Sequence, residues 1–121
     1  MAERTLRDCR ILLVEDEYLL AMALQDKLQD LHAVVLGPVS SLEDALALIR
    51  SDMSIDGAVL DINLGGTMAY PAADLLLERN IPFVFTTGYD KSTIPDRFGT
   101  ILRLHKPFDV SRIVQAIGCP L

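Results

Sequence analysis

Short apolar runs alternate along the chain with segments whose apolar residues recur at helical spacing. The first run, residues 11–14, is wholly aliphatic and stops at Glu15-Asp16. A run without polar alternation predicts a strand that is covered on both faces. The segment after it predicts an amphipathic helix, because its leucines recur at spacings of four, four and three residues: Leu20, Leu24, Leu28 and Leu31.

Apolar runs of the same kind predict four further strands. They are residues 33–36, closed by Gly37-Pro38; residues 58–60, ending on Asp61; residues 83–85; and residues 101–104. A glycine loop, Gly65-Gly66, follows the third strand of the chain. Every run is far shorter than the roughly 20 apolar residues of a membrane span, so we expect no membrane segment.

Helix signals fill the intervals between these strands. The stretch Ser40-Ser41-Leu42-Glu43 matches a capping box, with Ser40 as the N-cap and Glu43 reaching back to it. Pro71 suits the first turn of a helix over residues 71–79. The last helix is indicated by an apolar stripe before Gly118: Val110, Ile113, Val114 and Ile117.

Five strands that alternate with five connections predict a doubly wound α/β fold with a five-stranded parallel sheet. Right-handed crossovers place helices on both faces of such a sheet. Residues 90–100 form the least helical connection, because Pro95 and Gly99 interrupt them. With 121 residues, we expect a single domain over residues 1–121.

Composition narrows the classes of partner. The net charge of −6 repels nucleic acid and anionic lipid, so we expect no direct nucleic-acid or membrane binding. Residues 1–8 lack the apolar core of a signal peptide, and a cytoplasmic location is expected. Cys9 and Cys119 stand near opposite ends of the chain and form no CxxC pair, so we expect reduced thiols.

Chemically useful side chains follow four of the predicted strands. In a doubly wound sheet the ligand site lies outside the carboxyl ends of the strands. Those ends carry three carboxylates, hydroxyl groups and a lysine: Glu15-Asp16, Asp61, Thr86-Thr87 and His105-Lys106-Pro107.

This set of groups favours phosphoryl chemistry with a hard cation. Two carboxylates about 4 Å apart repel by roughly 4 kcal/mol at an effective dielectric near 20, so a stable site needs a cation or a raised pKa. Oxygen ligands without histidine or cysteine suit Mg²⁺. A lysine and a threonine hydroxyl would bind phosphoryl oxygens while a carboxylate attacks phosphorus.

Residues 9–118 resemble the receiver domain of two-component response regulators. The matching pieces, in order, are Val14-Glu15-Asp16, Asp61 with Asn63 two residues later, Thr87, and Lys106-Pro107-Phe108. The resemblance implies a flavodoxin-like sheet with strand order 2-1-3-4-5. It also implies a signalling module that is not an enzyme.

The resemblance further implies a role for each matching residue. Asp61 would accept the phosphoryl group, Lys106 would pair with its oxygens, and Thr87 would be the switch hydroxyl. Mg²⁺, the cofactor expected, would be held by Asp16, by Asp61, by Glu15 directly or through water, and by the backbone carbonyl of Asn63. The Lys106–Pro107 bond is often cis in such domains.

Two positions depart from the family pattern. Leu64-Gly65 replaces a common Met-Pro pair, which predicts a more mobile loop. Arg103 stands at the switch position three residues before the lysine, where the family commonly has an aromatic residue. The run from Phe85 to Tyr89 resembles a Phe-x-Thr-Gly-aromatic subset of receivers, many of them single-domain and associated with HWE-type or related histidine kinases. Tyr89 is either the substitute switch aromatic or a simple half-buried ring.

The leading functional hypothesis is phosphotransfer from a histidine kinase or phosphotransfer protein to Asp61, followed by altered binding to a downstream protein. The chain extends only a few residues past the closing helix, which favours a receiver without an output domain. One alternative is a pseudo-receiver that binds partners without phosphorylation. Another is a haloacid-dehalogenase-like phosphatase, which would need an aspartate where Asn63 stands. The oligomeric state is left open, because Pro95 interrupts the fourth connection.

Overall fold

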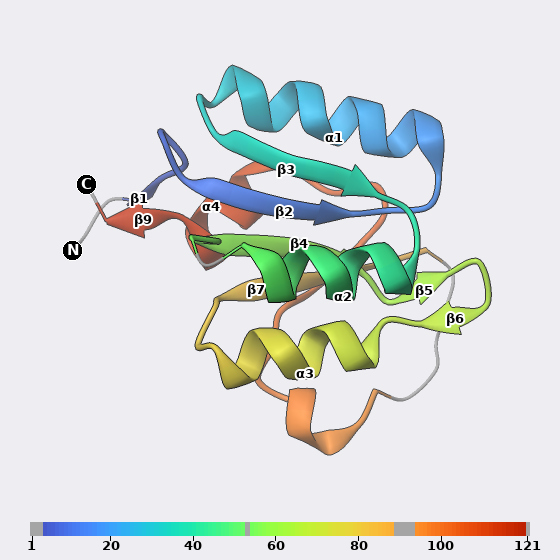
Figure 1. Cartoon of the computed structure of the whole chain (residues 1–121). Coiled ribbons are helices and arrows are strands. Elements are labelled where there is room, and N and C mark those ends of the chain that lie inside the picture. The colour runs from blue at the N-terminus through green and yellow to red at the C-terminus, as the bar shows by residue number, and fades with distance from the viewer. Residues whose placement is uncertain (1–3, 53, 89–93, 121) are drawn as a thin grey trace.

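The computed structural model describes residues 4–52, 54–88 and 94–120. A five-stranded parallel sheet forms its centre, with the order β3-β2-β4-β7-β8 (Figure 1). In chain order these strands stand 2-1-3-4-5, which confirms the expected doubly wound α/β fold. The strands are β2 (Arg10–Val14), β3 (Val34–Val39), β4 (Gly57–Asp61), β7 (Phe83–Thr87) and β8 (Arg103–His105).

Helices cover both faces of this sheet (Figure 1). One face packs against α1 (Tyr18–Asp30) and α4 (Ser111–Ile117), and the other against α2 (Leu42–Ser51) and α3 (Tyr70–Glu78). Alternate strand residues serve the two layers, as Leu13 and Val59 face α1 and α4 while Leu12 and Leu60 face α2 and α3. This alternation explains the continuous apolar runs, because both faces of each strand are buried.

The second strand is longer than the sequence pattern predicts. The prediction closed it at Gly37-Pro38, but β3 continues through this pair to Val39. Gly37 has a φ of +98°, and a Cβ there would lie 2.7 Å from the backbone nitrogen of Val39. The chain thus makes a local irregularity, and pairing with β2 resumes between Val14 and Val39. A glycine–proline pair ends a strand only where the backbone cannot return to register.

The cap of α2 differs by one residue from the predicted box. Ser41, not Ser40, is the N-cap, and its hydroxyl accepts a hydrogen bond of 3.1 Å from the backbone N–H of Asp44. Two adjacent serines satisfy the same sequence pattern equally well. The turn of the chain after β3 decides between them, and Ser40 is left exposed.

The expected glycine loop after β4 is a folded hairpin. Strands β5 (Asn63–Leu64) and β6 (Thr67–Met68) pair in antiparallel fashion around Gly65 and Gly66. Both glycines have positive φ angles, 63° and 100°, which two-residue hairpin turns require and which glycine adopts without steric cost.

The two ends of the described chain lie together (Figure 1). Strand β1 (Arg4–Thr5) pairs in antiparallel fashion with β9 (Cys119–Pro120), and the sequence pattern predicted neither strand. Cys119 packs against the buried cluster that contains Cys9, and both thiols are free. The fourth connection contains one turn of 3₁₀ helix, η1 (Asp96–Phe98), consistent with the predicted interruption by Pro95.

Among the described residues, no helix combines the length and the apolar character that crossing a bilayer requires.

Replacing the N-cap residue of α2 should destabilise the domain more than replacing the serine before it. Ser41→Ala removes the hydroxyl that accepts from Asp44, so the free energy of unfolding should fall by about 1 kcal/mol. Ser40→Ala, the matched control, should change it by less than about 0.5 kcal/mol. Urea unfolding of the two variants measures both values, and equal losses would contradict the assignment of the cap.

Candidate functional site

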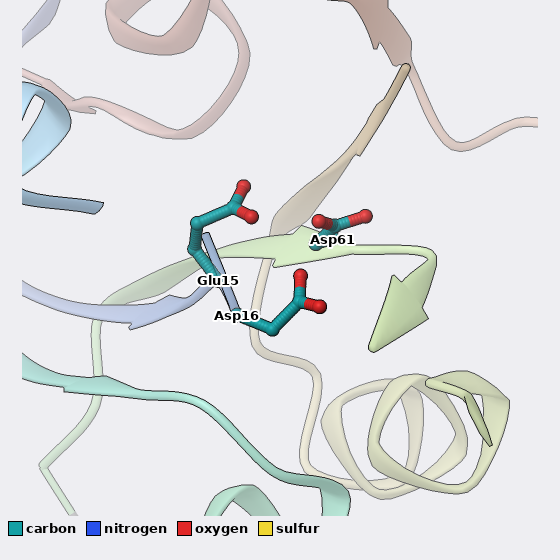
Figure 2. A group of neighbouring side chains, drawn as sticks. All are labelled: Glu15, Asp16 and Asp61. Atoms are coloured by element: carbon teal, nitrogen blue, oxygen red, sulfur yellow. The ribbon is translucent and has the colours of Figure 1, made fainter. Parts of the chain in front are cut away.

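Three carboxylates meet at the carboxyl ends of two central strands. Glu15 follows Val14, whose partner in β4 is Leu60, so Glu15 lies level with Asp61. Figure 2 shows these two side chains grouped with Asp16, and one oxygen from each lies within 4.8 Å of the others. Glu15 and Asp61 are only 2% and 3% exposed, whereas Asp16 is exposed. Two buried charges of one sign therefore lie side by side.

Lys106 brings positive charge to this cluster. Its Nζ donates to Asp61 Oδ2 at 3.0 Å and lies 3.0 Å from Glu15 Oε2. The backbone N–H of Lys106 donates to the carbonyl of Thr87, at 2.9 Å, which ties the residue to the end of β7. The Lys106–Pro107 bond is cis, as the sequence resemblance implied.

Burial and repulsion change the acidity of this group. Burial, with the adjacent Asp61 carboxylate, raises the pKa of Glu15 to about 7, although the backbone N–H of Glu17 and the Lys106 ammonium act in the opposite direction. Burial alone would lower the pKa of Lys106, but its contacts with Asp61 and Glu15 raise that pKa overall. The lysine is therefore charged at neutral pH, while the Glu15 carboxylate holds a proton easily. A positive charge in addition to Lys106 would favour the ionised form of Glu15.

A cavity of about 370 Å³ opens beside the three carboxylates. Its walls come from the carboxyl ends of the strands and from the β5–β6 hairpin. The lining residues are Asp16, Glu17, Asp61, Asn63, Gly65, Gly66, Thr87, Gly88 and Lys106. Five predicted site residues therefore share one cavity: Asp16, Asp61, Asn63, Thr87 and Lys106.

The β5–β6 hairpin fixes the position of the Asp61 carboxylate. The backbone N–H of Asn63 donates to Asp61 Oδ1 at 3.1 Å. The side chain of Asn63 accepts in turn from the backbone N–H of Gly66 at 2.6 Å. One oxygen of Asp61 is thus held by the hairpin and the other by Lys106, so the carboxylate has a defined orientation.

Arg103, a further predicted switch residue, does not line this cavity. Arg103 is half-buried in β8 and stands level with Phe85 of β7, on the face that packs against α2 and α3. Phe85 makes edge contacts there with Phe98 and Tyr70. Tyr89 lies outside the described residues.

Sequence reasoning missed Glu17 as a site residue. The sequence pattern assigned it no role, yet Glu17 lines the cavity and its Oε1 lies 3.6 Å from Lys106 Nζ. The signal was its place directly after Glu15-Asp16, before the first helix begins at Tyr18. Gly65, Gly66 and Gly88 line the cavity as well, because residues without side chains leave it open.

The arrangement meets the chemical requirements of a hard-cation site. The donors are oxygen atoms, as Mg²⁺ prefers, and one carboxylate is exposed to the open cavity. A buried glutamate oxygen, Glu15 Oε2, has no hydrogen bond among the described residues, although it lies close to Lys106. These residues therefore fit a divalent cation.

Comparisons with known proteins identify the family. No family model matches the sequence, and no curated protein matches it. The solution structure of SdrG from Sphingomonas melonis Fr1 is 41% identical, with a TM-score of 0.78, and the match covers 90% of this chain and 92% of that one. A response regulator receiver protein from Sinorhizobium medicae WSM419 is 26% identical, with a TM-score of 0.77 over 93% of this chain and 94% of that one.

The chain belongs to the receiver-domain family of response regulators. A third match, the receiver domain of the response regulator PhyR from Erythrobacter litoralis, is 25% identical, with a TM-score of 0.72 over 92% of this chain and 88% of that one. Receiver domains are signalling modules rather than enzymes, which agrees with the sequence prediction. The acidic cluster lies where the sequence pattern expected it, at the carboxyl edge of the receiver sheet.

The stability of the metal-free receiver should fall as the pH rises toward neutrality. Folding raises the pKa of Glu15 from an ordinary value of 4.5 to about 7, so between these values the folded state binds more protons than the unfolded state. The stabilisation from this proton is complete below pH 4.5 and is lost as the pH passes about 7. Urea unfolding in a chelator across this range measures the slope. Glu15→Gln should flatten it, and an unchanged slope would contradict this account.

Removing the lysine should destabilise the metal-free receiver strongly. Lys106→Ala leaves two buried carboxylates without their counter-charge, so the free energy of unfolding should fall by about 3 kcal/mol at neutral pH. Lys27→Ala, which removes an exposed lysine of α1, should change it by less than about 0.5 kcal/mol. Denaturant unfolding with chelator present compares them. A loss for Lys106→Ala no larger than for the control would refute the proposed electrostatic role.

Proposed function

We propose that this receiver accepts a phosphoryl group on Asp61 from a histidine kinase or phosphotransfer protein. The observation that carries the proposal is the environment of Asp61. Its buried carboxylate is oriented by the backbone of Asn63 and by Lys106, and it lines an open cavity. A carboxylate fixed in this way is positioned to attack a phosphorus atom that enters the cavity.

The residues around Asp61 supply the other groups that phosphoryl transfer needs. Lys106 is charged, and its ammonium would bind phosphoryl oxygens once a phosphoryl group is on Asp61. The hydroxyl of Thr87, at the end of β7, would hydrogen-bond another phosphoryl oxygen. Phosphorylation would thereby change the contacts at the end of this strand. Because Lys106 donates its backbone N–H to the carbonyl of Thr87, the two residues would respond together.

Mg²⁺ is the cation proposed for this site. Asp16, Asp61 and the backbone carbonyl of Asn63 would hold it, with Glu15 acting directly or through water. The ion would supply charge neutralisation for the phosphoryl oxygens. The raised pKa of Glu15 supports this assignment, because a neighbouring cation would favour the ionised carboxylate.

The signal is proposed to leave the receiver through protein contacts. The net charge of −6 disfavours binding to nucleic acid, and we propose that the chain works as one receiver domain in the cytoplasm. Phosphorylation would change the surface around Thr87, and a downstream protein would bind the changed surface. Asn63 stands where a haloacid-dehalogenase-like phosphatase would need an aspartate, so turnover of a substrate is not proposed.

Phosphorylation of Asp61 can be tested by intact mass. The purified chain, incubated with acetyl phosphate or phosphoramidate and Mg²⁺, should gain the mass of one phosphoryl group. Asp61→Asn and a chelated sample should gain none. Asp26→Asn, which removes an exposed carboxylate of α1, should gain it like the wild type.

The cognate kinase provides the second arm of this test. Small donors do not load every receiver, so a sample without an adduct is incubated with the autophosphorylated kinase. If neither donor labels the chain, Asp61 is not a phosphoacceptor. The chain is then a receiver fold that binds partners without phosphorylation.

A further inference from the structure

The side chain of Thr86 has no role in the site as described, yet it carries a buried polar atom. Thr86 is 1% exposed, and among the described residues its hydroxyl has no hydrogen-bond partner. A hydroxyl without a partner destabilises a buried position, whereas valine would fill the same volume with no polar atom. The hydroxyl of Thr86 would therefore gain a hydrogen-bond partner in another state of the site, such as one with a bound ligand.

The register of the sheet places Thr86 directly beside the acceptor. Thr86 pairs with Asp61 of β4 on one side and with Leu104 of β8 on the other. Paired residues of neighbouring parallel strands lie about 5 Å apart and point to the same face. Because Glu15 is level with Asp61 on the next strand, the three residues form one row across β2, β4 and β7.

Lys106 reaches Asp61 by crossing this row. Lys106 follows β8, and β7 lies between β8 and β4 in the sheet. Its Nζ nevertheless lies 3.0 Å from both Asp61 Oδ2 and Glu15 Oε2. The lysine side chain therefore spans the end of β7 on the face where Thr86 points. Thr86 does not line the open cavity, although it lies on the same face of β7.

We propose that Thr86 is a positioning residue, whose hydroxyl accepts a hydrogen bond from the Lys106 ammonium when the site is loaded. In the structure the ammonium has carboxylate oxygens of Asp61 and Glu15 as neighbours. Engagement of those oxygens by a divalent cation leaves N–H groups of Lys106 in need of another acceptor. Thr86 Oγ1 supplies it at the point where the side chain crosses β7. The ligand class rests on the proposed function.

Thermal unfolding with and without Mg²⁺ tests the inference without phosphorylation. Thr86→Val keeps the shape of the side chain and removes the hydroxyl, while Thr86→Ser keeps the hydroxyl. In chelator, Thr86→Val should melt at or above the wild-type temperature, because an unpartnered buried hydroxyl is gone. With saturating Mg²⁺ the wild type and Thr86→Ser should gain about 3–5 °C more than Thr86→Val gains.

The rate of phosphorylation by phosphoramidate gives a second readout. Thr86→Val should be phosphorylated about tenfold more slowly, as expected for the loss of one hydrogen bond to a charged group, and Thr86→Ser should stay near the wild-type rate. Val84→Ala is the matched control, since Val84 lies on the same strand and face and is fully buried. It should lower the melting temperature and leave the rate within about twofold of wild type.

The outcomes separate this inference from the proposed function. Equal Mg²⁺ responses and equal rates in wild type and Thr86→Val would overturn the role of Thr86 while leaving phosphorylation intact. A wild type that no donor labels would sink the proposed function, and the Mg²⁺ response alone would then decide on Thr86. A lower melting temperature of Thr86→Val in chelator would show that the hydroxyl already has a partner, which also overturns the inference.

Discussion

The pairing of Lys106 with two buried carboxylates is the interaction on which the rest of the site depends. Glu15 and Asp61 stand level on adjacent strands, and their ionised forms repel each other in a region that water reaches poorly. The lysine offsets burial and repulsion only in part, because burial, with the adjacent Asp61, still raises the pKa of Glu15 to about 7. The site thus has a deficit of positive charge, which the divalent cation proposed for it would remove. The proposed affinity for the cation would then follow from how the strands end.

The fold makes this crowding possible at modest cost. A doubly wound parallel sheet buries both faces of β2, β4 and β7, so their backbone positions are fixed by packing on either side. The backbone at the strand ends is therefore rigid as well. It holds the charged side chains close together although they repel one another. The loops beyond the ends then adjust the chemistry. The β5–β6 hairpin holds one oxygen of Asp61, and the segment after β8 brings Lys106 to the other.

The same constraint explains why the site combines satisfied and unsatisfied groups. Among the described side chains, the two buried oxygen atoms without a hydrogen bond, Glu15 Oε2 and Thr86 Oγ1, flank Asp61 in one row. Elsewhere in the described core, buried positions are apolar. Polar atoms that lack partners destabilise a buried site, and a state of the site in which they gain partners would be favoured for that reason.

The sequence by itself determined the class of fold and most of the cavity. Short apolar runs separated by helical stripes predict a parallel sheet with helices on both faces, and the carboxyl edge of that sheet then collects Asp16, Asp61, Thr87 and Lys106. These features are local in the sequence, or follow from one topological rule.

Only the tertiary structure decided the features that depend on residues distant in the chain. Which of two adjacent serines caps α2, and whether β3 continues past Gly37, depend on backbone geometry and neighbouring strands. The pairing of β1 with β9 joins segments more than a hundred residues apart, so no periodicity in the local sequence predicts it. The burial of Thr86 beside Asp61 has the same origin. The register of three strands sets it, and a threonine in an apolar strand otherwise indicates only a β-branched residue.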